Sequence, residues 1–155
     1  MNTLENTIET FKGKKTKGFV PVLPIYHTAA CEGAGITLEE FSTSAEKHAE
    51  VMLRAYITLG FHGVQLTLGV AVEAEAMGAR TRQPEKGLPA VTEHLLEDLA
   101  NFKKMKVPDP YKDGRMPLFI EAVRQVQKAI GSEAVVIATV RGPFITAGQL
   151  RGLNA

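Results

Sequence analysis

The chain has 155 residues, of which 45% are hydrophobic and 23% are charged, and its 18 basic and 17 acidic side chains give a formal net charge of +1. This composition is typical of a globular protein and excludes a strongly charged surface that would recruit nucleic acid or a membrane. Because the amino terminus lacks the apolar segment of a signal peptide and no apolar run could span a membrane, we expect a cytoplasmic protein.

The amino-terminal part of the chain is predicted to contain a short helix and a weak strand. Apolar residues share one face of a helix over residues 2–11, and a polar connector follows over residues 13–18. Residues 19–25 are mostly apolar, which favours a buried strand, but two prolines in this run each remove a donor from the ladder. We therefore predict an irregular or edge-like strand that opens into a loop over residues 26–35.

The clearest predicted helix follows this loop. Thr43 and Glu46 have the spacing of a capping box, an apolar stripe continues behind them, and Gly60 is placed to end the helix. Residues 61–68 are mostly apolar, as expected of a parallel strand that is covered on both faces. Residues 71–79 are predicted to be helical.

The remaining elements continue the alternation of strands and helices. We predict a loop over residues 81–87, a helix over residues 93–104, a helix over residues 116–130 and a strand over residues 134–140. Long crossovers between strands predict parallel pairing in right-handed βαβ units. The fold class is therefore α/β. About three parallel strands are expected, whereas a TIM (β/α)8 barrel needs eight strands and roughly 250 residues, so the pattern indicates an incomplete barrel of about three β/α units.

Ionisable side chains follow the two strongest predicted strands. Enzymes with β/α architecture place their chemistry in such loops, which gives Glu73 a possible pocket role, while Glu73 and Glu75 also suit the amino-terminal end of a helix. The loop after the last strand contains Arg141, Pro143 and Phe144, and Arg141 could hold an anionic group. Both interpretations of this loop, a pocket wall and plain loop geometry, remain open.

The four histidines and the single cysteine give weaker signals. Cys31 excludes an internal disulfide and a multi-cysteine zinc motif within the chain. His27 lies four residues before it in a predicted loop, so a metal or nucleophile pair competes with an inert buried thiol. His48 and His94 are predicted to lie at the surface of amphipathic helices, and His62 is predicted to have a structural role at the amino-terminal face of its strand.

Four segments, in order, resemble the amino-terminal half of the uroporphyrinogen decarboxylase superfamily. They are PVLPI at 21–25, GFHGVQLTLGVAVEAEAMGA at 60–79, LEDLANFKKMKVPDPYKDGRMPLFIEAV at 96–123 and ATVRGPFITAGQL at 138–150. The resemblance implies a (β/α)8 barrel. It divides the chain into an amino-terminal helix and connector, residues 1–18, and the amino-terminal part of a truncated barrel, residues 19–155.

The decarboxylases of this superfamily have two features that the chain lacks. Their first strand is followed by an arginine-rich turn that grips the carboxylates of a porphyrinogen, whereas residues 26–31 contain no arginine. Their catalytic aspartate lies in an FSD-type motif whose place is taken here by Gly69. Without the anion clamp and the acid, decarboxylation is the second interpretation rather than the first.

The corrinoid-dependent methyltransferases of the superfamily resemble the chain better. Their VEAEA string with a following glycine is reproduced at residues 72–76 and Gly78, although His62 replaces the aspartate that is frequent in the turn before the strand. The resemblance implies methyl transfer between a methyl-corrinoid protein and a thiol or other acceptor. In that chemistry zinc, bound by His and Cys, activates the thiol.

The zinc ligands of these methyltransferases lie in the second half of the barrel. Consequently the resemblance implies that catalytic residues lie outside this chain, that no metal site lies within it, and that neither zinc nor corrinoid is bound by this stretch alone. A corrinoid protein and a small-molecule substrate are the expected partners, and His27, Glu73, Arg141, Pro143 and Phe144 are the expected substrate-binding residues. Activity is not expected of these 155 residues alone, and a non-catalytic remnant of the family is a third interpretation.

Overall fold

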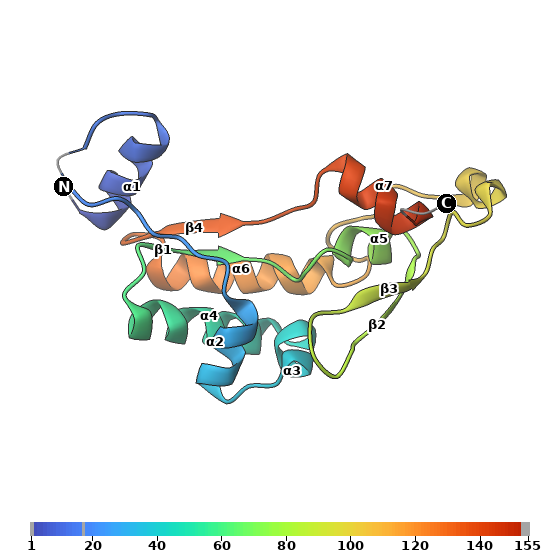
Figure 1. Cartoon of the computed structure of the whole chain (residues 1–155), viewed down its shortest axis with the longest axis horizontal. Helices are drawn as coiled ribbons and strands as arrows, with labels where there is room; N and C mark the ends of the chain where they lie inside the picture. The colour runs from blue at the N-terminus through green and yellow to red at the C-terminus, as the bar shows by residue number, and fades with distance from the viewer. Residues whose placement is uncertain (1, 17, 153–155) are drawn as a thin grey trace. The chain divides into compact units, whose positions relative to one another are not determined.

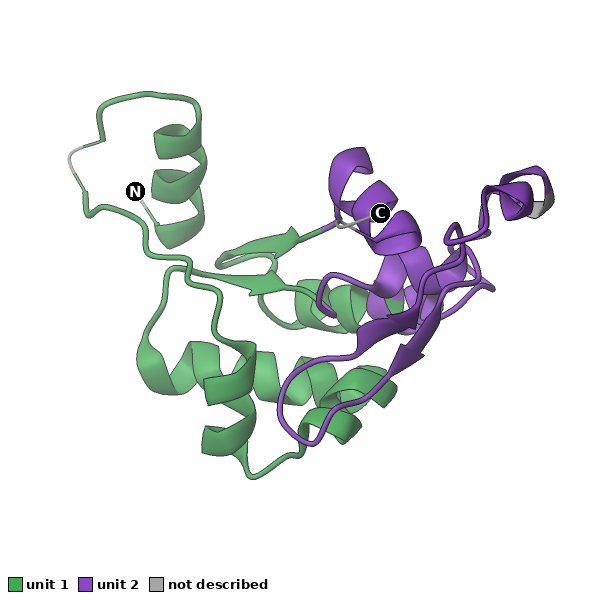
Figure 2. Ribbon diagram, turned by 45° about the vertical axis from the view of Figure 1, so that its right-hand side comes forward, with its two compact units in different colours: residues 1–67, 121–139 green, residues 68–120, 140–155 purple. Residues whose placement is uncertain are grey.

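The structure is a computed structural model that describes residues 2–16 and 18–152, and it has an α/β organisation (Figure 1). In chain order its elements are α1 (Thr3–Phe11), α2 (His27–Ala34), α3 (Leu38–Thr43), α4 (Ala45–Leu59), β1 (Gly63–Leu66), α5 (Val72–Ala76), β2 (Arg80–Arg82), β3 (Ala90–Glu93), the 3-10 helix η1 (Leu99–Lys104), α6 (Met116–Ile130), β4 (Val135–Ala138) and α7 (Pro143–Arg151). Two units, each made of two stretches of chain, contain these elements (Figure 2). Unit 1 comprises residues 1–67 and 121–139, and unit 2 comprises residues 68–120 and 140–155.

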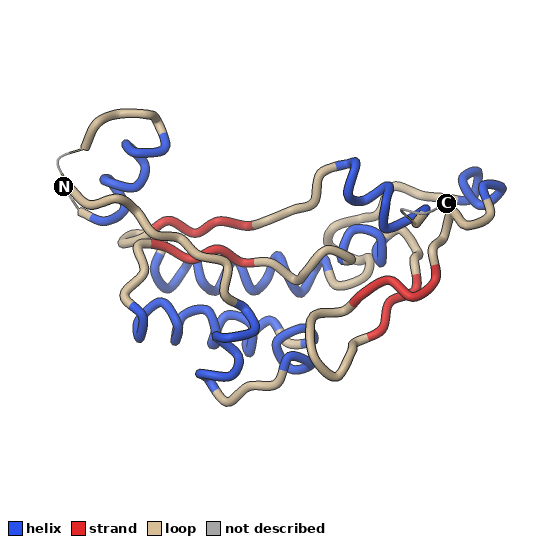
Figure 3. Tube along the Cα trace, viewed as in Figure 1, coloured by secondary structure: helices blue, strands red, loops and turns tan. Residues whose placement is uncertain are grey.

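Unit 1 is organised around two parallel strands, β1 and β4, which lie side by side (Figure 3). Gln65 pairs with Ile137 and Leu66 with Ala138, so the predicted parallel pairing of these two segments is confirmed. Val64 and Leu66 are fully buried on one face of β1, and α4 packs against this strand. Helices α2 and α3 pack in turn on α4.

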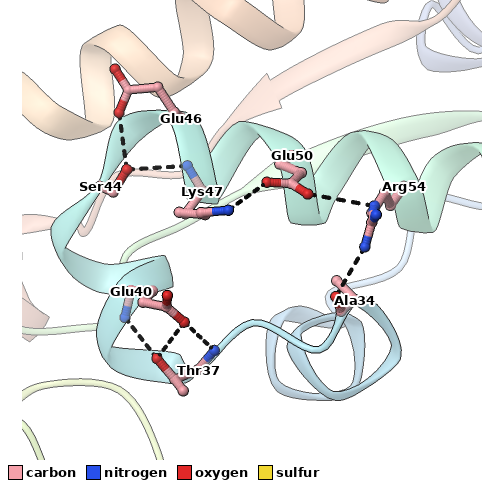
Figure 4. A network of polar contacts seen from close by, with 8 residues as sticks. All are labelled: Ala34, Thr37, Glu40, Ser44, Glu46, Lys47, Glu50 and Arg54. Atoms are coloured by element: carbon pink, nitrogen blue, oxygen red, sulfur yellow. Dashed lines mark hydrogen bonds and ion pairs between the residues drawn. The ribbon is translucent and has the colours of Figure 1, made fainter.

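The helix predicted after the first loop is confirmed as α4, but its amino-terminal cap differs from the prediction. Ser44, rather than Thr43, caps α4, and its hydroxyl accepts the backbone N–H of Lys47 at 3.2 Å. The capping box belongs to the preceding helix α3, where Thr37 and Glu40 each accept a backbone N–H from the other residue (Figure 4). The motif with a threonine and a glutamate three residues later occurs twice within ten residues, and only the first copy begins a helix.

The predicted strand over residues 19–25 does not form, and the loop predicted after it is largely helical. These residues run as an extended segment beside the start of β1, where the backbone N–H of Val22 donates to His62 Nδ1 at 3.0 Å and the His62 N–H donates to the Val22 carbonyl at 3.1 Å. The Phe19 ring stacks on His62 with a centroid distance of 4.0 Å. His62 therefore has the predicted structural role. Its two hydrogen bonds to Val22 hold the segment where the prolines, which lack an N–H, prevent a regular strand ladder.

His48 lies in the core of unit 1, which contradicts its predicted place at the surface. Its side chain is fully buried on α4, and its ring stacks on Phe41 with a centroid distance of 4.0 Å. Burial lowers the pKa of His48 to about 4 by disfavouring the charged ring, against the opposing effect of a backbone hydrogen bond to Phe41. The histidine is therefore neutral in the folded chain near neutral pH.

Folding is expected to depend on pH through this buried histidine. The unfolded chain binds the His48 proton near pH 6.5, whereas the folded chain binds it only near pH 4. The stability due to neutral His48 is thus complete above the higher value and is lost as the pH falls through the lower one. We expect the free energy of unfolding to decrease by roughly 3 kcal/mol across this window, and His48→Leu to remove that decrease. Urea unfolding across the window measures it, and an unchanged pH slope in the variant would contradict the assignment.

Unit 2 contains an antiparallel hairpin where other structures were predicted. The segment predicted as a loop over residues 81–87 begins inside β2, and the helix predicted over residues 93–104 is instead the end of β3, a turn and η1. The strands are three and four residues long and mostly exposed, so they carry no apolar alternation that a sequence pattern could reveal. The core of unit 2 is formed by a buried cluster with packed neighbours: Ala74, Met77, Ala79, Val91, Leu95, Leu96, Met105 and Leu150.

Candidate functional site

The loop that follows β1 leads through Gly69 into the short helix α5. Gly69 has a φ of +91°, a conformation that favours glycine, and a Cβ there would lie 3.2 Å from the side chain of Leu88. Glu73 lies in the first turn of α5, as predicted from the VEAEA string. The sequence therefore turns sharply at Gly69 and presents a carboxylate four residues later.

The loop that follows β4 presents Arg141 and then begins α7. Gly142 is the N-cap, and Pro143 lies in the first turn of the helix. An N–H group at that position has no acceptor within the helix, so a proline there costs no hydrogen bond. Phe144 is 82% exposed, and Pro143 is exposed as well. The predicted strand and the tight loop after it are therefore confirmed, and the helix α7 follows them.

Two hydrogen bonds join these loops within unit 2. The Arg141 backbone N–H donates to Glu73 Oε1 at 2.7 Å, and the Arg141 Nε–H donates to the carbonyl of Gly69 at 3.2 Å. Each loop thus contributes a side chain that bonds to the backbone of the other, although the partners are 68 and 72 residues apart in sequence. We call these two bonds the loop contact. The second carboxylate oxygen, Glu73 Oε2, is buried and makes no hydrogen bond within the described part of the chain.

The two glutamates of α5 have different surroundings. Glu75 Oε2 accepts the Arg115 Nε–H at 2.8 Å and the Thr81 hydroxyl at 3.2 Å, and the Arg115 side chain is only 14% exposed. This ion pair ties α5 to β2 and to the segment before α6. Glu75 therefore has a structural partner, whereas Glu73 faces the loop after β4.

Removing Arg115 is expected to destabilise unit 2. Arg115→Ala leaves the Glu75 carboxylate largely shielded from water without its cation, and we expect a loss of about 2 kcal/mol in the free energy of unfolding. The exposed pair of Arg80 and Glu93, with side chains 75% and 64% exposed, is the matched control, and Arg80→Ala should cost less than about 1 kcal/mol. Urea denaturation of both variants measures the difference, and equal losses would contradict the structural role of Arg115.

His27 and Cys31 belong to unit 1 rather than to the unit that contains the loop contact. His27 is the first residue of α2 and is half-buried, and Cys31 is 2% exposed in the same helix. Burial, assisted by the negative charge of Glu32, raises the pKa of the Cys31 thiol to about 11. The thiol therefore stays protonated near neutral pH, which favours the inert interpretation of Cys31 over a nucleophile.

Sequence reasoning overlooked one polar pair on the parallel strands of unit 1. Gln65 Nε2 donates to Thr139 Oγ1 at 2.9 Å, which joins β1 to the residue that follows β4. The only available signal was a glutamine between Val64 and Leu66 in an apolar run.

Within residues 2–16 and 18–152 no three His, Cys, Asp or Glu side chains lie close enough together to hold a metal ion. None of the helices there combines the length and the apolar character that a membrane span needs.

The sequence matches the uroporphyrinogen decarboxylase (URO-D) family over residues 2–154, so the chain belongs to this family, as its motifs indicated. Among its curated relatives are the methylcobamide:CoM methyltransferases MtbA of Methanosarcina acetivorans, 27% identical over 122 residues, and MtaA of Methanosarcina barkeri, 28% identical over 136 residues. The matches cover 78% and 84% of this chain but 36% and 40% of those proteins, so the chain spans less than half the length of the relatives.

A solved methyltransferase from Methanosarcina mazei has the same fold. It superposes with a TM-score of 0.82 at 23% sequence identity, over 99% of this chain and 46% of that chain. The named relatives are methyltransferases rather than decarboxylases, in agreement with the interpretation favoured by the sequence.

Proposed function

We propose that this chain forms the amino-terminal part of a corrinoid-dependent methyltransferase, which moves a methyl group between a methyl-corrinoid protein and a thiol or other acceptor. The observation that carries the proposal is the similarity to two methylcobamide:CoM methyltransferases over most of the chain, together with the loop contact between the segments that follow β1 and β4 in sequence. Loops at the carboxyl ends of parallel strands are where β/α enzymes bind their substrates.

The proposed architecture is a (β/α)8 barrel to which this chain contributes about the first three β/α units. Strands β1 and β4 would be neighbouring strands of the barrel, and the extended segment over residues 19–25 would take the place of the strand before β1. The superposition on less than half of a solved methyltransferase supports this arrangement.

Glu73 and Arg141 are proposed to form one wall of the substrate pocket. The carboxylate of Glu73 orders the loop after β4, and the guanidinium group of Arg141 supplies a positive charge suited to an anionic group on the substrate. Pro143 and Phe144 follow this loop in the first turn of α7, where both are exposed. His27 remains a proposed substrate-binding residue on the first helix after the extended segment.

The chemistry implied by the resemblance requires zinc to activate the thiol, and a corrinoid protein as the methyl donor. The described residues provide no group that fits zinc, so no role in metal binding is assigned to this chain. Its proposed contribution is to bind and orient the substrate.

Decarboxylation is less well supported, for a geometric reason. The position of the decarboxylases' catalytic aspartate is occupied by Gly69, whose carbonyl accepts from Arg141 and whose backbone conformation would be strained for any other residue. The helix α2 also occupies the place of their arginine-rich turn and contains no arginine.

The proposal is tested with the full-length protein that carries this chain. Incubation with methylcobalamin and 2-mercaptoethanesulfonate should produce the methylated thiol. The change in the corrinoid absorption spectrum monitors the reaction, and mass spectrometry identifies the product. Uroporphyrinogen, offered in a parallel reaction, should release no carbon dioxide. Decarboxylation without methyl transfer would overturn the proposal, and inactivity in both reactions would favour the non-catalytic remnant.

A further inference from the structure

The hairpin of β2 and β3 contacts the segment that follows β1 at two points. All of these residues belong to unit 2, together with α5 and α7 (Figure 2). At the first point the Thr81 hydroxyl donates to Glu75 Oε2 at 3.2 Å. At the second, a Cβ built at Gly69 would lie 3.2 Å from the Cβ and 3.3 Å from the Cδ1 of Leu88, so the leucine fills the space beside the glycine backbone. The two points bracket Glu73, which makes the loop contact.

The backbone of Gly69 depends on its neighbours to keep one orientation. Glycine loses more conformational freedom on ordering than any other residue, and Gly69 has a φ of +91° and no side chain of its own to pack. Its carbonyl accepts the Arg141 Nε–H at 3.2 Å, so the orientation of the glycine peptide and that of the guanidinium group are coupled. Leu88 restricts this backbone from the side on which another residue would carry its side chain.

The hairpin fixes where Leu88 lies. Ala90, two residues after Leu88, pairs with Arg82 in the antiparallel ladder. Between them Pro89 is buried, and its ring fixes its own φ angle. Most side chains of β2 and β3 are exposed, whereas Leu88 is half-buried against Gly69. The leucine is therefore an apolar contact of the hairpin with the loop after β1.

We propose that Leu88 is a positioning residue, which fixes the guanidinium group of Arg141 for the anionic end of the acceptor thiol by holding the backbone of Gly69. This inference rests on the proposed function, in which Arg141 holds an anionic group of the substrate. Contacts between a guanidinium group and an anionic oxygen are directional, and a displacement of about 1 Å can cost a hundredfold in rate. Leu88 has no polar group, so its effect on the substrate passes through Gly69 and Arg141.

The alternative is that Leu88 only contributes packing to unit 2. Leu88→Ala removes the Cγ and Cδ1 atoms beside Gly69, and both roles predict some loss of stability. A packing role lowers activity toward every thiol alike, and its effect adds to that of a change at Arg141. A positioning role affects the anionic thiol alone, and its effect disappears once the guanidinium group is absent, because residues that act through one another are not additive.

The experiment compares 2-mercaptoethanesulfonate with ethanethiol, which lacks the anionic group, as acceptors from methylcobalamin in the full-length protein. We expect the ratio of kcat/KM for the two thiols to fall about tenfold in Leu88→Ala, and less than about twofold when the same change is made in Arg141→Met. Leu88→Met conserves the side-chain volume and should keep the ratio. Leu95→Ala, which truncates a partly buried leucine in the core of unit 2, is the matched control and should also keep it.

The outcomes separate the inference from the proposed function. An unchanged ratio in Leu88→Ala, or an undiminished fall in the Arg141→Met background, overturns the inference alone. A wild-type protein that methylates neither thiol overturns the proposed function, and an Arg141→Met variant with an unchanged ratio overturns the anion-binding role of Arg141; the inference falls with either. If Leu88→Ala does not fold, Leu88→Val provides the same comparison with a smaller loss of packing.

Discussion

Under the proposed function, replacing Glu73 by alanine in the full-length protein is expected to lower kcat/KM for methyl transfer ten- to a hundredfold. The change removes the carboxylate that accepts the Arg141 N–H, so the loop after β4 loses the hydrogen bond that fixes it to α5. Hydrogen bonds to charged groups are typically worth about 1.5 to 3 kcal/mol, and each 1.4 kcal/mol corresponds to a tenfold change in rate. Steady-state kinetics with methylcobalamin and a thiol measure the effect.

Two further variants separate the loop contact from other roles of this carboxylate. Glu73→Gln keeps a carbonyl oxygen that can accept the same N–H, so it should retain most of the activity. Glu85→Ala removes an exposed glutamate from the β2–β3 hairpin loop and should leave the kinetics unchanged. If Glu73→Ala behaves like the Glu85 variant, the loop contact has no part in substrate binding.

Replacing Gly63 by alanine is expected to destabilise the protein by about 3 kcal/mol. A Cβ at this position would lie 2.6 Å from the backbone carbonyl oxygen of Val135 and 2.6 Å from the side chain of Leu23. The leucine can rotate, but the carbonyl belongs to the neighbouring strand, so the paired backbones must move apart. Overpacking of this kind typically costs about 1 to 3 kcal/mol, and lost ladder bonds add to it.

A glycine in helix α2 provides the matched control for this substitution. No atom lies within 4 Å of a Cβ built at Gly33, so Gly33→Ala should stabilise the protein by roughly 0.5 to 1 kcal/mol. Chemical denaturation of both variants measures the two opposite shifts. Destabilisation by both substitutions to a similar extent would show that the approach of β4 to β1 is not the cause.

Elements with a strong apolar period were predictable from the sequence. Helix α6 has the predicted bounds, and α4 and the pair β1 and β4 differ from the prediction by a few residues at their ends. The buried residues of α4 and α6 recur at helical spacing, and Val64 and Leu66 of β1 are two residues apart, so local pattern and tertiary packing agree in these elements.

Elements without such a period were not predictable. The hairpin of β2 and β3 consists of short, mostly exposed strands, and its bonds depend on pairing rather than on local preference. The burial of His48 was also missed, although the residue lies three positions after Ala45 and four before Met52, on the buried face of the helix. Its stacking on Phe41 of another helix is a tertiary property.

The residues of the candidate site could be predicted from the sequence, but the hydrogen bonds between them could not. The positions of Glu73 and Arg141 after two strands could be read from the chain, because the loops of β/α folds follow their strands directly. Their hydrogen bond joins residues that are 68 apart in sequence, and no local pattern specifies such a tertiary contact. Gln65 was overlooked because its neighbours made the whole run look apolar.

The distance in sequence between Gln65 and Thr139 has a consequence for how the chain tolerates change in length. The bond between them closes a stretch of 74 residues, and the entropy of closing a long stretch grows only with the logarithm of its length. Ten extra residues inserted between the exposed residues Glu85 and Lys86, in the segment that joins β2 to β3, would therefore add roughly 0.1 kcal/mol to that closure. Insertions and deletions among homologous chains are accordingly expected to concentrate between Gln65 and Thr139. The pairing register of β1 and β4 is expected to stay the same.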